Sequence, residues 1–317
     1  MNTNMSAKGG SASGGKNIKF IGSMPAIVTP FKKNGDLDLP ALEKLVEYQL
    51  KGGVDAIVAA GSTGEAATLT DDEYVEVIKT VVKKVAASKI RVPVIVGAGS
   101  NNTKRAVHLS ELAKKAGADA LLHVTPFYNK PTPNGLVLHF KEIAKAVDLP
   151  IIIYNVPGRT GSNVMPQTIL RIAREVPSVA AVKEASGSLN QMMEIISEVR
   201  TNGPKNFAIL SGDDALTLPL IGAGGHGCIS VVANEIPEMF SRMVHLALAG
   251  NFKEAGELHY KMLPLMNVNF IESNPIPVKY ALASMGLIEE SLRLPLTELE
   301  EKNRAIVEKV LKELKLI

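Results

Sequence analysis

The stretch VIVGAGSNNTKRAVHLSELAKKAGADALLHV, residues 94–124, decides the fold class because two apolar runs flank one amphipathic segment. Residues 94–97 and 120–124 are short and apolar on both faces, which is typical of buried parallel strands. Residues 103–116 between them have the pattern of a helix. A strand, a helix and a second strand in this order predict a right-handed βαβ unit.

The same alternation continues on both sides of this unit. Further apolar runs bring the total to eight predicted strands, and they lie at residues 24–28, 56–60, 151–154, 179–182, 207–210 and 228–232. Helical stretches such as residues 39–51, 71–87 and 135–146 separate them. Eight such units in a row predict a (β/α)8 TIM barrel, with an open, doubly wound sheet as the alternative architecture.

After Asn234 the pattern becomes purely helical, with segments near residues 237–248, 251–266, 277–283 and 298–315. We therefore expect a barrel domain at residues 18–240 and a C-terminal helical extension at residues 241–317, which reads as an appendage on the barrel. Residues 1–17 are rich in Ser, Gly and Lys and lack the apolar segment of a signal peptide. We therefore expect a disordered tail and no secretory signal.

Composition excludes several classes of function. The 317 residues carry a formal charge of only +3, which argues against broad nucleic-acid or membrane-surface binding. No apolar run reaches the roughly 18–20 residues that a membrane span requires. The single cysteine, Cys228, rules out an intrachain disulfide and favours a reducing compartment, so a cytoplasmic location is expected.

Reactive side chains gather where the predicted strands end, which is the face where barrels of this kind carry out catalysis. The stretches concerned are GSTGE at 61–65, TPFYNKP at 125–131, YNVPGRTG at 154–161, KEASG at 183–187 and SGDD at 211–214. The paired acids Asp213 and Asp214 suit the start of a helix better than a cation site. No histidine pair has metal-ligand spacing, so we predict no metal.

Lys183 directly follows the strand at residues 179–182 and, with a period of two, shares a face with Ala181 and Val179. An amine on the barrel interior would lose hydration, which favours its neutral form and attack on a carbonyl. An exposed strand-end lysine is the competing interpretation. Tyr154 ends the neighbouring strand, so its phenol can meet Lys183 over the barrel mouth and move protons, unless it is merely a core aromatic.

Two further groups suit the binding of carboxylates. The turn containing Ser62 and Thr63 could offer backbone N–H groups and hydroxyls to a small carboxylate, although an ordinary helix-capping turn would look similar. Arg159, in a turn rich in Pro and Gly, could clamp a second carboxylate with two hydrogen bonds, or could simply be solvated. The GxGxxG match at residues 222–227 precedes a strand, so it does not predict a dinucleotide site.

Taken together, GSTGE, TPFYNKP, YNVPGRTG, VKEASG, LSGDD and ESNPIPVK resemble the motifs of dihydrodipicolinate synthases, in the same order and from about residue 18 to the C-terminus. GSTGE alone is shared with the wider superfamily of pyruvate-dependent class I aldolases. The resemblance implies a Schiff-base-forming lyase that condenses pyruvate with L-aspartate 4-semialdehyde on the route to diaminopimelate and lysine. It implies no cofactor and a homotetramer built from tight dimers.

The resemblance also implies roles for single residues. Lys183 forms the imine and Tyr154 relays protons to it. Ser62, which is usually Thr in the family, and Thr63 hold the pyruvate carboxylate, and Ser62 joins the relay. Tyr128 completes the relay in a neighbouring subunit, and Arg159 binds the carboxylate of the semialdehyde. Gly212 and the backbone carbonyl of Ile229 line the site.

Two departures from the family pattern bear on specificity and regulation. Ser62 also occurs in N-acetylneuraminate lyases, but those relatives lack the arginine at the position of Arg159. Lysine-inhibited members have Ser, two His and Glu where this chain has Ala66, Asp71, Tyr74 and Arg105, so we predict weak or absent inhibition by lysine, although Asn101 and Phe127 keep part of that pocket. A sibling aldolase of the N-acetylneuraminate lyase or sugar-acid type, a non-catalytic 2-oxo acid sensor and a phosphate-binding isomerase are the alternative functions.

Overall fold

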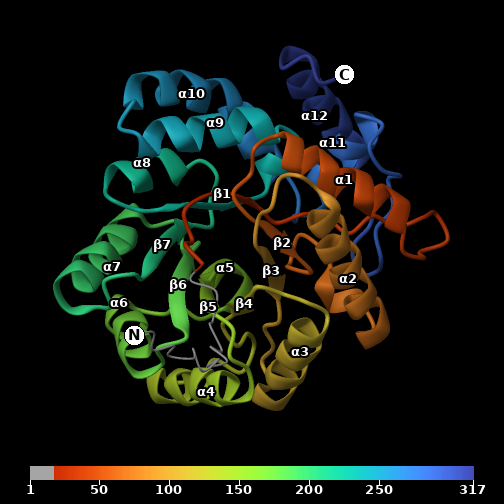
Figure 1. Cartoon of the computed structure of the whole chain (residues 1–317). Coiled ribbons are helices and arrows are strands. Elements are labelled where there is room, and N and C mark those ends of the chain that lie inside the picture. The colour runs from red at the N-terminus through yellow and green to blue at the C-terminus, as the bar shows by residue number, and fades with distance from the viewer. Residues whose placement is uncertain (1–17) are drawn as a thin grey trace, which may run out of the picture.

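Eight short, buried, parallel strands form the centre of the computed structural model, which describes residues 18–317 (Figure 1). The tail expected at residues 1–17 lies outside the described residues. The strands are β1 Gly22–Pro25, β2 Ile57–Ala59, β3 Val94–Gly97, β4 Ala120–Val124, β5 Ile151–Asn155, β6 Val179–Glu184, β7 Ala208–Ser211 and β8 Gly227–Ser230.

The strands follow one another around the sheet in the order β1-β8-β7-β6-β5-β4-β3-β2. Between β1 and β2 the sheet closes through a parallel bridge from Ala26 to Val58. Beside it, the N–H of Ile27 donates to the carbonyl oxygen of Val58 at 3.0 Å. The sheet is therefore a barrel and not an open doubly wound sheet, which confirms the predicted (β/α)8 architecture.

A helix follows each strand and packs on the outside of the barrel. These helices are α1 Leu39–Lys51, α2 Asp71–Ala87, α3 Thr103–Lys115, α4 Pro133–Ala146, α6 Pro166–Glu175, α7 Leu189–Asn202, α8 Thr217–Gly222 and α9 Pro237–Leu248. Short helical turns precede three of them, namely η1 Ala66–Thr68, α5 Pro157–Thr160 and η2 Val232–Asn234. Local sequence defines their starts: α2 begins with a capping box in which Thr70 and Glu73 bond each other's backbone N–H groups.

The alternation of side chains along each strand separates two apolar layers. Met24, Ile95 and Ile152 point into the barrel and pack with one another in its interior. Neighbouring residues such as Val96 and Ile153 point outward and pack in the layer beneath the helices. Both faces of every strand are thus buried, as their near-continuous apolar composition requires.

A β-bulge in β6 overturns one detail of the expected strand geometry. Ile151 pairs with Val179, but the next residue, Ile152, pairs with Ala181, so Ala180 is the extra residue. The bulge interrupts the period of two. Val179 therefore packs in the outer layer and does not share a face with Lys183, whereas Ala181 lies in the barrel interior as predicted.

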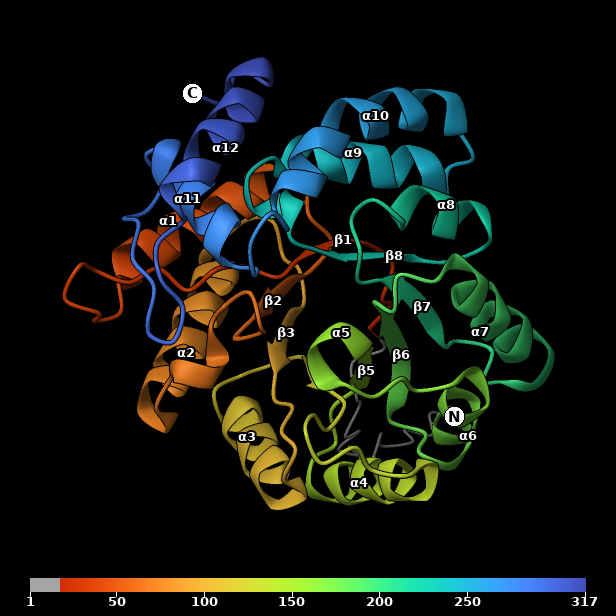
Figure 2. The same ribbon diagram turned by 180° about the vertical axis from the view of Figure 1, so that it is seen from behind.

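Three more helices follow α9: α10 Phe252–Val268, α11 Ile276–Ser284 and α12 Glu301–Glu313. Helix α10 lies along α9, and α12 packs against both α10 and α11 (Figure 2). These helices have an apolar core of their own, with Phe240 from α9, Met262 and Leu265 from α10, and Val307 from α12. Among the described residues, no helix is both long and apolar enough to cross a membrane.

Candidate active site

The carboxyl ends of the strands surround a cavity of about 150 Å3, at the face where the sequence places the reactive side chains. The predicted site residues that line this cavity are Ser62, Thr63, Tyr154, Arg159, Lys183 and Gly212. The barrel therefore gathers side chains from four different strand ends and loops into one small volume.

Lys183 and Tyr154 lie side by side because their strands pair in register. The two residues are direct partners in the ladder between β5 and β6. Lys183 is only 5% exposed, and its Nζ lies 4.2 Å from the centroid of the Tyr154 ring. Within residues 18–317 this Nζ makes no hydrogen bond or ion pair. A buried amine that faces a cavity and has no carboxylate partner is available as a nucleophile.

Gly212 provides the room that the lysine side chain needs. A Cβ atom at this position would lie 2.6 Å from Cβ of Ala185 and 3.0 Å from Cε of Lys183. Real Cβ atoms do not approach other atoms so closely. Glycine directly after β7 is therefore required by the space that Ala185 and Lys183 occupy together.

The turn after β2 and the short helix α5 are joined by Asn274, in the loop between α10 and α11. Its Nδ2 donates to Oγ1 of Thr63 at 2.9 Å, and its carbonyl oxygen accepts a hydrogen bond from Nη2 of Arg159 at 3.0 Å. Asn274 is buried, and both Asn274 and Phe270 line the cavity. The two predicted carboxylate-binding groups are thus held on either side of Asn274.

Sequence reasoning missed Asn274 and Phe270 as site residues. Asn274 belongs to the ESNPIPVK stretch, so that motif carried a usable signal. Phe270 lies between α10 and α11, outside all of the motifs, and no local pattern distinguishes it. Both were overlooked because the helical extension was interpreted as an appendage, whereas its chain returns to the mouth of the barrel.

A buried polar network connects the ends of β5 and β6, at the residues that directly follow Tyr154 and Lys183. Asn155 and Glu184, the residues after Tyr154 and Lys183, are fully buried, and Nδ2 of Asn155 donates to Oε2 of Glu184 at 2.9 Å. The backbone N–H of Ser186 donates to the other oxygen of Glu184 at 2.7 Å. Because the two neighbours of the reactive pair are bonded to each other, the relative position of β5 and β6 is fixed at this point.

Two predicted residues lie outside the cavity. Tyr128, in the loop after β4, is 89% exposed and has a φ of +71°. Its side chain does not line the cavity of its own chain. Ile229 is buried in the barrel interior within β8, and Val231, two residues later, lines the cavity.

Asp213 and Asp214, which follow β7, make different hydrogen bonds. Oδ1 of Asp213 accepts the N–H groups of Ala215 and Leu216, so it caps the turn that leads into α8, in line with the expected helix start. Asp214 is instead buried against β8, where Oδ2 accepts the N–H groups of Val231 and Val232. Burial raises the pKa of Asp214. The expectation of a shared helix-capping role therefore holds for Asp213 only.

The fold and the site together define a class of protein: a (β/α)8 barrel with a buried lysine that can bind a carbonyl substrate as an imine. Among the described residues, no cluster of three or more His, Cys, Asp or Glu residues could hold a metal ion. The cavity itself offers the amine of Lys183, the phenol of Tyr154, the hydroxyls of Ser62 and Thr63, and the guanidinium of Arg159.

Comparison with known proteins places the chain within that class. Residues 19–314 match the dihydrodipicolinate synthetase family, and the chain belongs to this family. The 4-hydroxy-tetrahydrodipicolinate synthase of Maridesulfovibrio salexigens is 52% identical over 295 residues, which are 93% of this chain and 98% of that protein. The similarity spans almost the whole of both chains, so the resemblance seen in the motifs is confirmed.

Solved structures agree with this assignment. The dihydrodipicolinate synthase of Thermotoga maritima superposes with a TM-score of 0.91 at 44% identity, covering 95% of this chain and 100% of the other. The chloride-inhibited enzyme of Acinetobacter baumannii, solved in complex with pyruvate, gives a TM-score of 0.90 at 44% identity and covers 94% and 100% of the two chains.

Proposed function

We propose that this chain is a 4-hydroxy-tetrahydrodipicolinate synthase, a lyase that condenses pyruvate with L-aspartate 4-semialdehyde. One observation carries the proposal: the amine of Lys183 is buried beside Tyr154, has no carboxylate partner, and faces a cavity lined by hydroxyls and an arginine. The Acinetobacter baumannii relative, which is described as a complex with pyruvate, supports the choice of the first substrate.

The reaction begins at Lys183. Its neutral amine attacks the carbonyl carbon of pyruvate, and loss of water gives an imine. Tyr154, whose ring lies against Nζ, and the hydroxyl of Ser62 move the protons of this step and of the next one, in which a methyl proton leaves and an enamine forms. Ser62 and Thr63 hold the pyruvate carboxylate, since both line the cavity in the turn after β2.

The second half of the reaction uses Arg159. The guanidinium lies at the exposed mouth of the cavity, where it can bind the carboxylate of the semialdehyde. The enamine carbon attacks the aldehyde carbon and forms the new C–C bond. The amino group of the second substrate then attacks the imine carbon and displaces Lys183, which closes the ring and regenerates the free amine.

The test is pyruvate consumption by the purified protein with and without L-aspartate 4-semialdehyde, each reaction being quenched with borohydride and analysed by mass spectrometry. We expect semialdehyde-dependent consumption and an adduct on Lys183. Lys183→Arg should abolish both, whereas Lys130→Arg, in the loop after β4, should abolish neither. An adduct without semialdehyde-dependent turnover would move the function to a sibling aldolase, and turnover without any adduct would contradict the imine mechanism.

We also propose that lysine inhibits this enzyme weakly or not at all. In the place where lysine-inhibited relatives offer a carboxylate, Arg105 forms an ion pair with Asp71, which also bonds Nε2 of His108 at 2.8 Å. The Arg105 hydrogen bond lowers the pKa of Asp71 to about 2, so this acid is already neutralised by a bound cation. Tyr74 is buried and its hydroxyl donates to the carbonyl oxygen of Gly97 at 2.9 Å.

Initial rates with increasing L-lysine test this second proposal. The rate should stay near its uninhibited value into the millimolar range, because a second cation would be repelled by Arg105. Half-inhibition at micromolar or low-millimolar lysine would contradict it. Arg105→Glu reintroduces the missing carboxylate and serves as the comparison, with increased sensitivity as the expected result.

A further inference from the structure

The GSTGE turn at residues 61–65 ends in Glu65, a residue for which the proposed chemistry has no use. Glu65 is 3% exposed and has a φ of +50°, in the left-handed region that residues with a Cβ atom rarely adopt. Such a conformation persists only where surrounding contacts determine it. The question is therefore what holds this glutamate, and what depends on its being held.

The carboxylate of Glu65 is bound by the C-terminal helices. Oε1 pairs with Nζ of Lys279, which lies in α11 and is fully buried, and Oε2 accepts the backbone N–H of Arg293 at 3.1 Å. Lys279 also donates to the carbonyl oxygen of Ser291 at 2.7 Å and lies over the ring of Phe31 at 4.3 Å. The last residue of GSTGE and the last residue of ESNPIPVK are thus partners across 214 positions of sequence.

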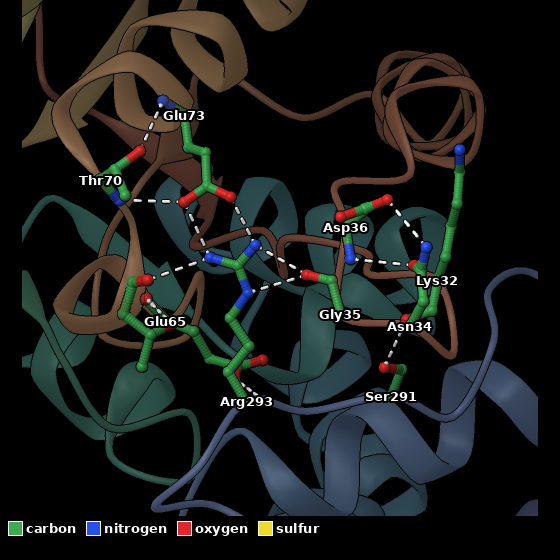
Figure 3. A network of polar contacts seen from close by, with 10 residues as sticks. Lys32, Asn34, Gly35, Asp36, Glu65, Thr70, Glu73, Ser291 and Arg293 are labelled. Carbon is green, nitrogen blue, oxygen red and sulfur yellow. Dashed lines mark hydrogen bonds and ion pairs between the residues drawn. The ribbon is translucent and has the colours of Figure 1, made fainter.

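Arg293, whose backbone N–H holds Glu65, is itself bound to α2 and to the loop between β1 and α1 (Figure 3). The guanidinium of Arg293 lies between the carboxylate of Glu73, at the start of α2, and the carbonyl oxygen of Gly35, to which its Nε and Nη2 donate at 3.0 and 2.7 Å. The Arg293 hydrogen bonds lower the pKa of Glu73 to about 2, so this pair stays charged. Arg293 therefore connects Glu65 to both α2 and the loop between β1 and α1.

A third contact fixes the turn from the barrel side. Oγ1 of Thr29, in the segment after β1, donates to the carbonyl oxygen of Gly64 at 2.7 Å and is buried. Ser62 and Thr63 lie between this anchor and the end of β2. The C-terminal side of the turn is thus bound at both Gly64 and Glu65, and these contacts restrain the backbone that carries Ser62 and Thr63.

We infer that Glu65, held by Lys279, is a positioning residue that keeps the turn at residues 61–65 in the conformation in which Ser62 and Thr63 receive the carboxylate of pyruvate. This inference rests on the proposed function, because it assigns the turn to the first substrate. It makes the C-terminal helices part of the pyruvate site, although Lys279 and Glu65 do not touch the substrate. Arg159, to which the proposed mechanism assigns the semialdehyde, bonds Asn274 and neither member of this pair.

A set of variants separates positioning from simple stabilisation. Lys279→Met leaves the buried carboxylate of Glu65 without its cation and should lower the unfolding midpoint, whereas the double variant Glu65→Gln with Lys279→Met removes both charges and should recover stability. For positioning, the double variant should still show a KM for pyruvate raised roughly tenfold, with the KM for the semialdehyde nearly unchanged. Recovery of stability and of the wild-type pyruvate KM together would overturn the inference.

Thr29→Val is a milder variant that alters no charge and keeps the side-chain volume. It removes the hydrogen bond to Gly64 and should raise the pyruvate KM by roughly threefold with little change in the semialdehyde KM. An unchanged pyruvate KM in this variant would also overturn the inference. Arg304→Met is the matched control, because Arg304 pairs with Glu290 and lies over the ring of Tyr280 without contacting the turn, so both KM values should stay as in the wild type.

Borohydride trapping distinguishes failure of the inference from failure of the proposed function. The wild-type protein is trapped first over a range of pyruvate concentrations. If it forms no adduct on Lys183, the proposed function fails and the inference falls with it. If it forms the adduct and the double variant traps pyruvate over the same concentration range, the inference alone is overturned.

Discussion

At the scale of single residues, the reactivity of Lys183 depends on two absences around its side chain: a carboxylate partner and a side chain at position 212. No carboxylate pairs with Nζ within residues 18–317, and Gly212 withholds a side chain from the volume through which the lysine extends. The buried carboxylate of Glu184 points away into hydrogen bonds with Asn155 and Ser186. A charged partner or a larger neighbour would remove the free amine from the cavity.

Substitution of Gly212 tests this arrangement. In Gly212→Ala, the new Cβ atom requires Ala185 or Lys183 to move, so we expect kcat/KM to fall by roughly tenfold or more, a loss of about 1.4 kcal/mol in transition-state stabilisation. Steady-state kinetics and borohydride trapping measure the effect, and circular dichroism checks the fold.

Gly158→Ala is the control for this prediction. It lies in α5 near the mouth of the same cavity, but an added Cβ atom there has nothing within 4 Å. Its activity should match the wild type. Equal activity of the Gly212 and Gly158 variants would show that the space beside Lys183 is not limiting.

At the scale of elements, two histidines are buried where α3 and α4 cover β4. His123 in β4 and His139 in α4 both pack against the ring of Phe140, in edge-to-face contacts. Each has one ring nitrogen near a hydroxyl: His123 near Ser110 at 3.3 Å, and His139 near Thr103 at 3.0 Å. Burial lowers the pKa of His123 to about 3 and that of His139 to about 4.

This histidine pair predicts a loss of stability in acid. In the unfolded chain both groups titrate near 6.5, so between that pH and their folded pKa values the unfolded state binds more protons. The free energy of unfolding should therefore fall below pH 6.5, by up to about 1.4 kcal/mol per pH unit for each histidine. Urea unfolding at several pH values measures this slope, and His123→Gln with His139→Gln should flatten it.

His245 provides a control of opposite sign. Its Nε2 lies 2.8 Å from Oδ2 of Asp55, and this bond raises the pKa of His245. Its contribution to stability is therefore fully present below pH 6.5 and disappears as the pH rises through the raised value. His245→Gln should therefore lower the free energy of unfolding by a constant amount below pH 6.5, without changing the slope there, and by progressively less as the pH rises through the raised value. An unchanged slope in the double variant of His123 and His139 would refute the burial argument.

At the scale of the whole molecule, the site extends beyond the barrel in two directions. The loop between α10 and α11 supplies Asn274 and Phe270 to the cavity, and α11 supplies Lys279 to the turn that carries Ser62. Tyr128 is 89% exposed and does not line the cavity of its own chain, and the family resemblance implies that it completes the proton relay of a neighbouring subunit. The homotetramer of tight dimers that the same resemblance implies would place a second subunit beside it.

Mixing two inactive variants tests whether Tyr128 acts across subunits. Lys183→Arg lacks the nucleophile and Tyr128→Phe lacks the relay hydroxyl, yet a mixed dimer contains one site with both residues intact. Random exchange should restore about a quarter of the wild-type activity, since half of the dimers hold one complete site out of two. Activity is measured after refolding the variants together and separately.

Two outcomes would contradict this prediction. Mixed samples that remain as inactive as the separate variants would place Tyr128 in its own chain's site or outside catalysis. Wild-type turnover by Tyr128→Phe alone would remove it from the relay. The variant should still form the pyruvate adduct, because imine formation takes place at Lys183.

The sequence by itself determined the order of strands and helices and the positions of the reactive groups at the strand ends. Buried parallel strands need apolar residues on both faces, and residues 94–124 show this pattern without help from the rest of the chain. The fixed topology of the barrel then places Lys183 and Tyr154 at one face. That part of the site could be predicted because it depends only on local pattern and on the handedness of βαβ units.

Tertiary structure alone decided which distant segments complete the site. The bulge at Ala180 moved Val179 to the outer layer, and the return of the C-terminal chain brought Asn274 to Thr63 and Lys279 to Glu65. Periodicity describes the face of an element but not the path of the loops between elements. Contacts across more than 200 residues depend on that path, which is set by packing of the whole chain.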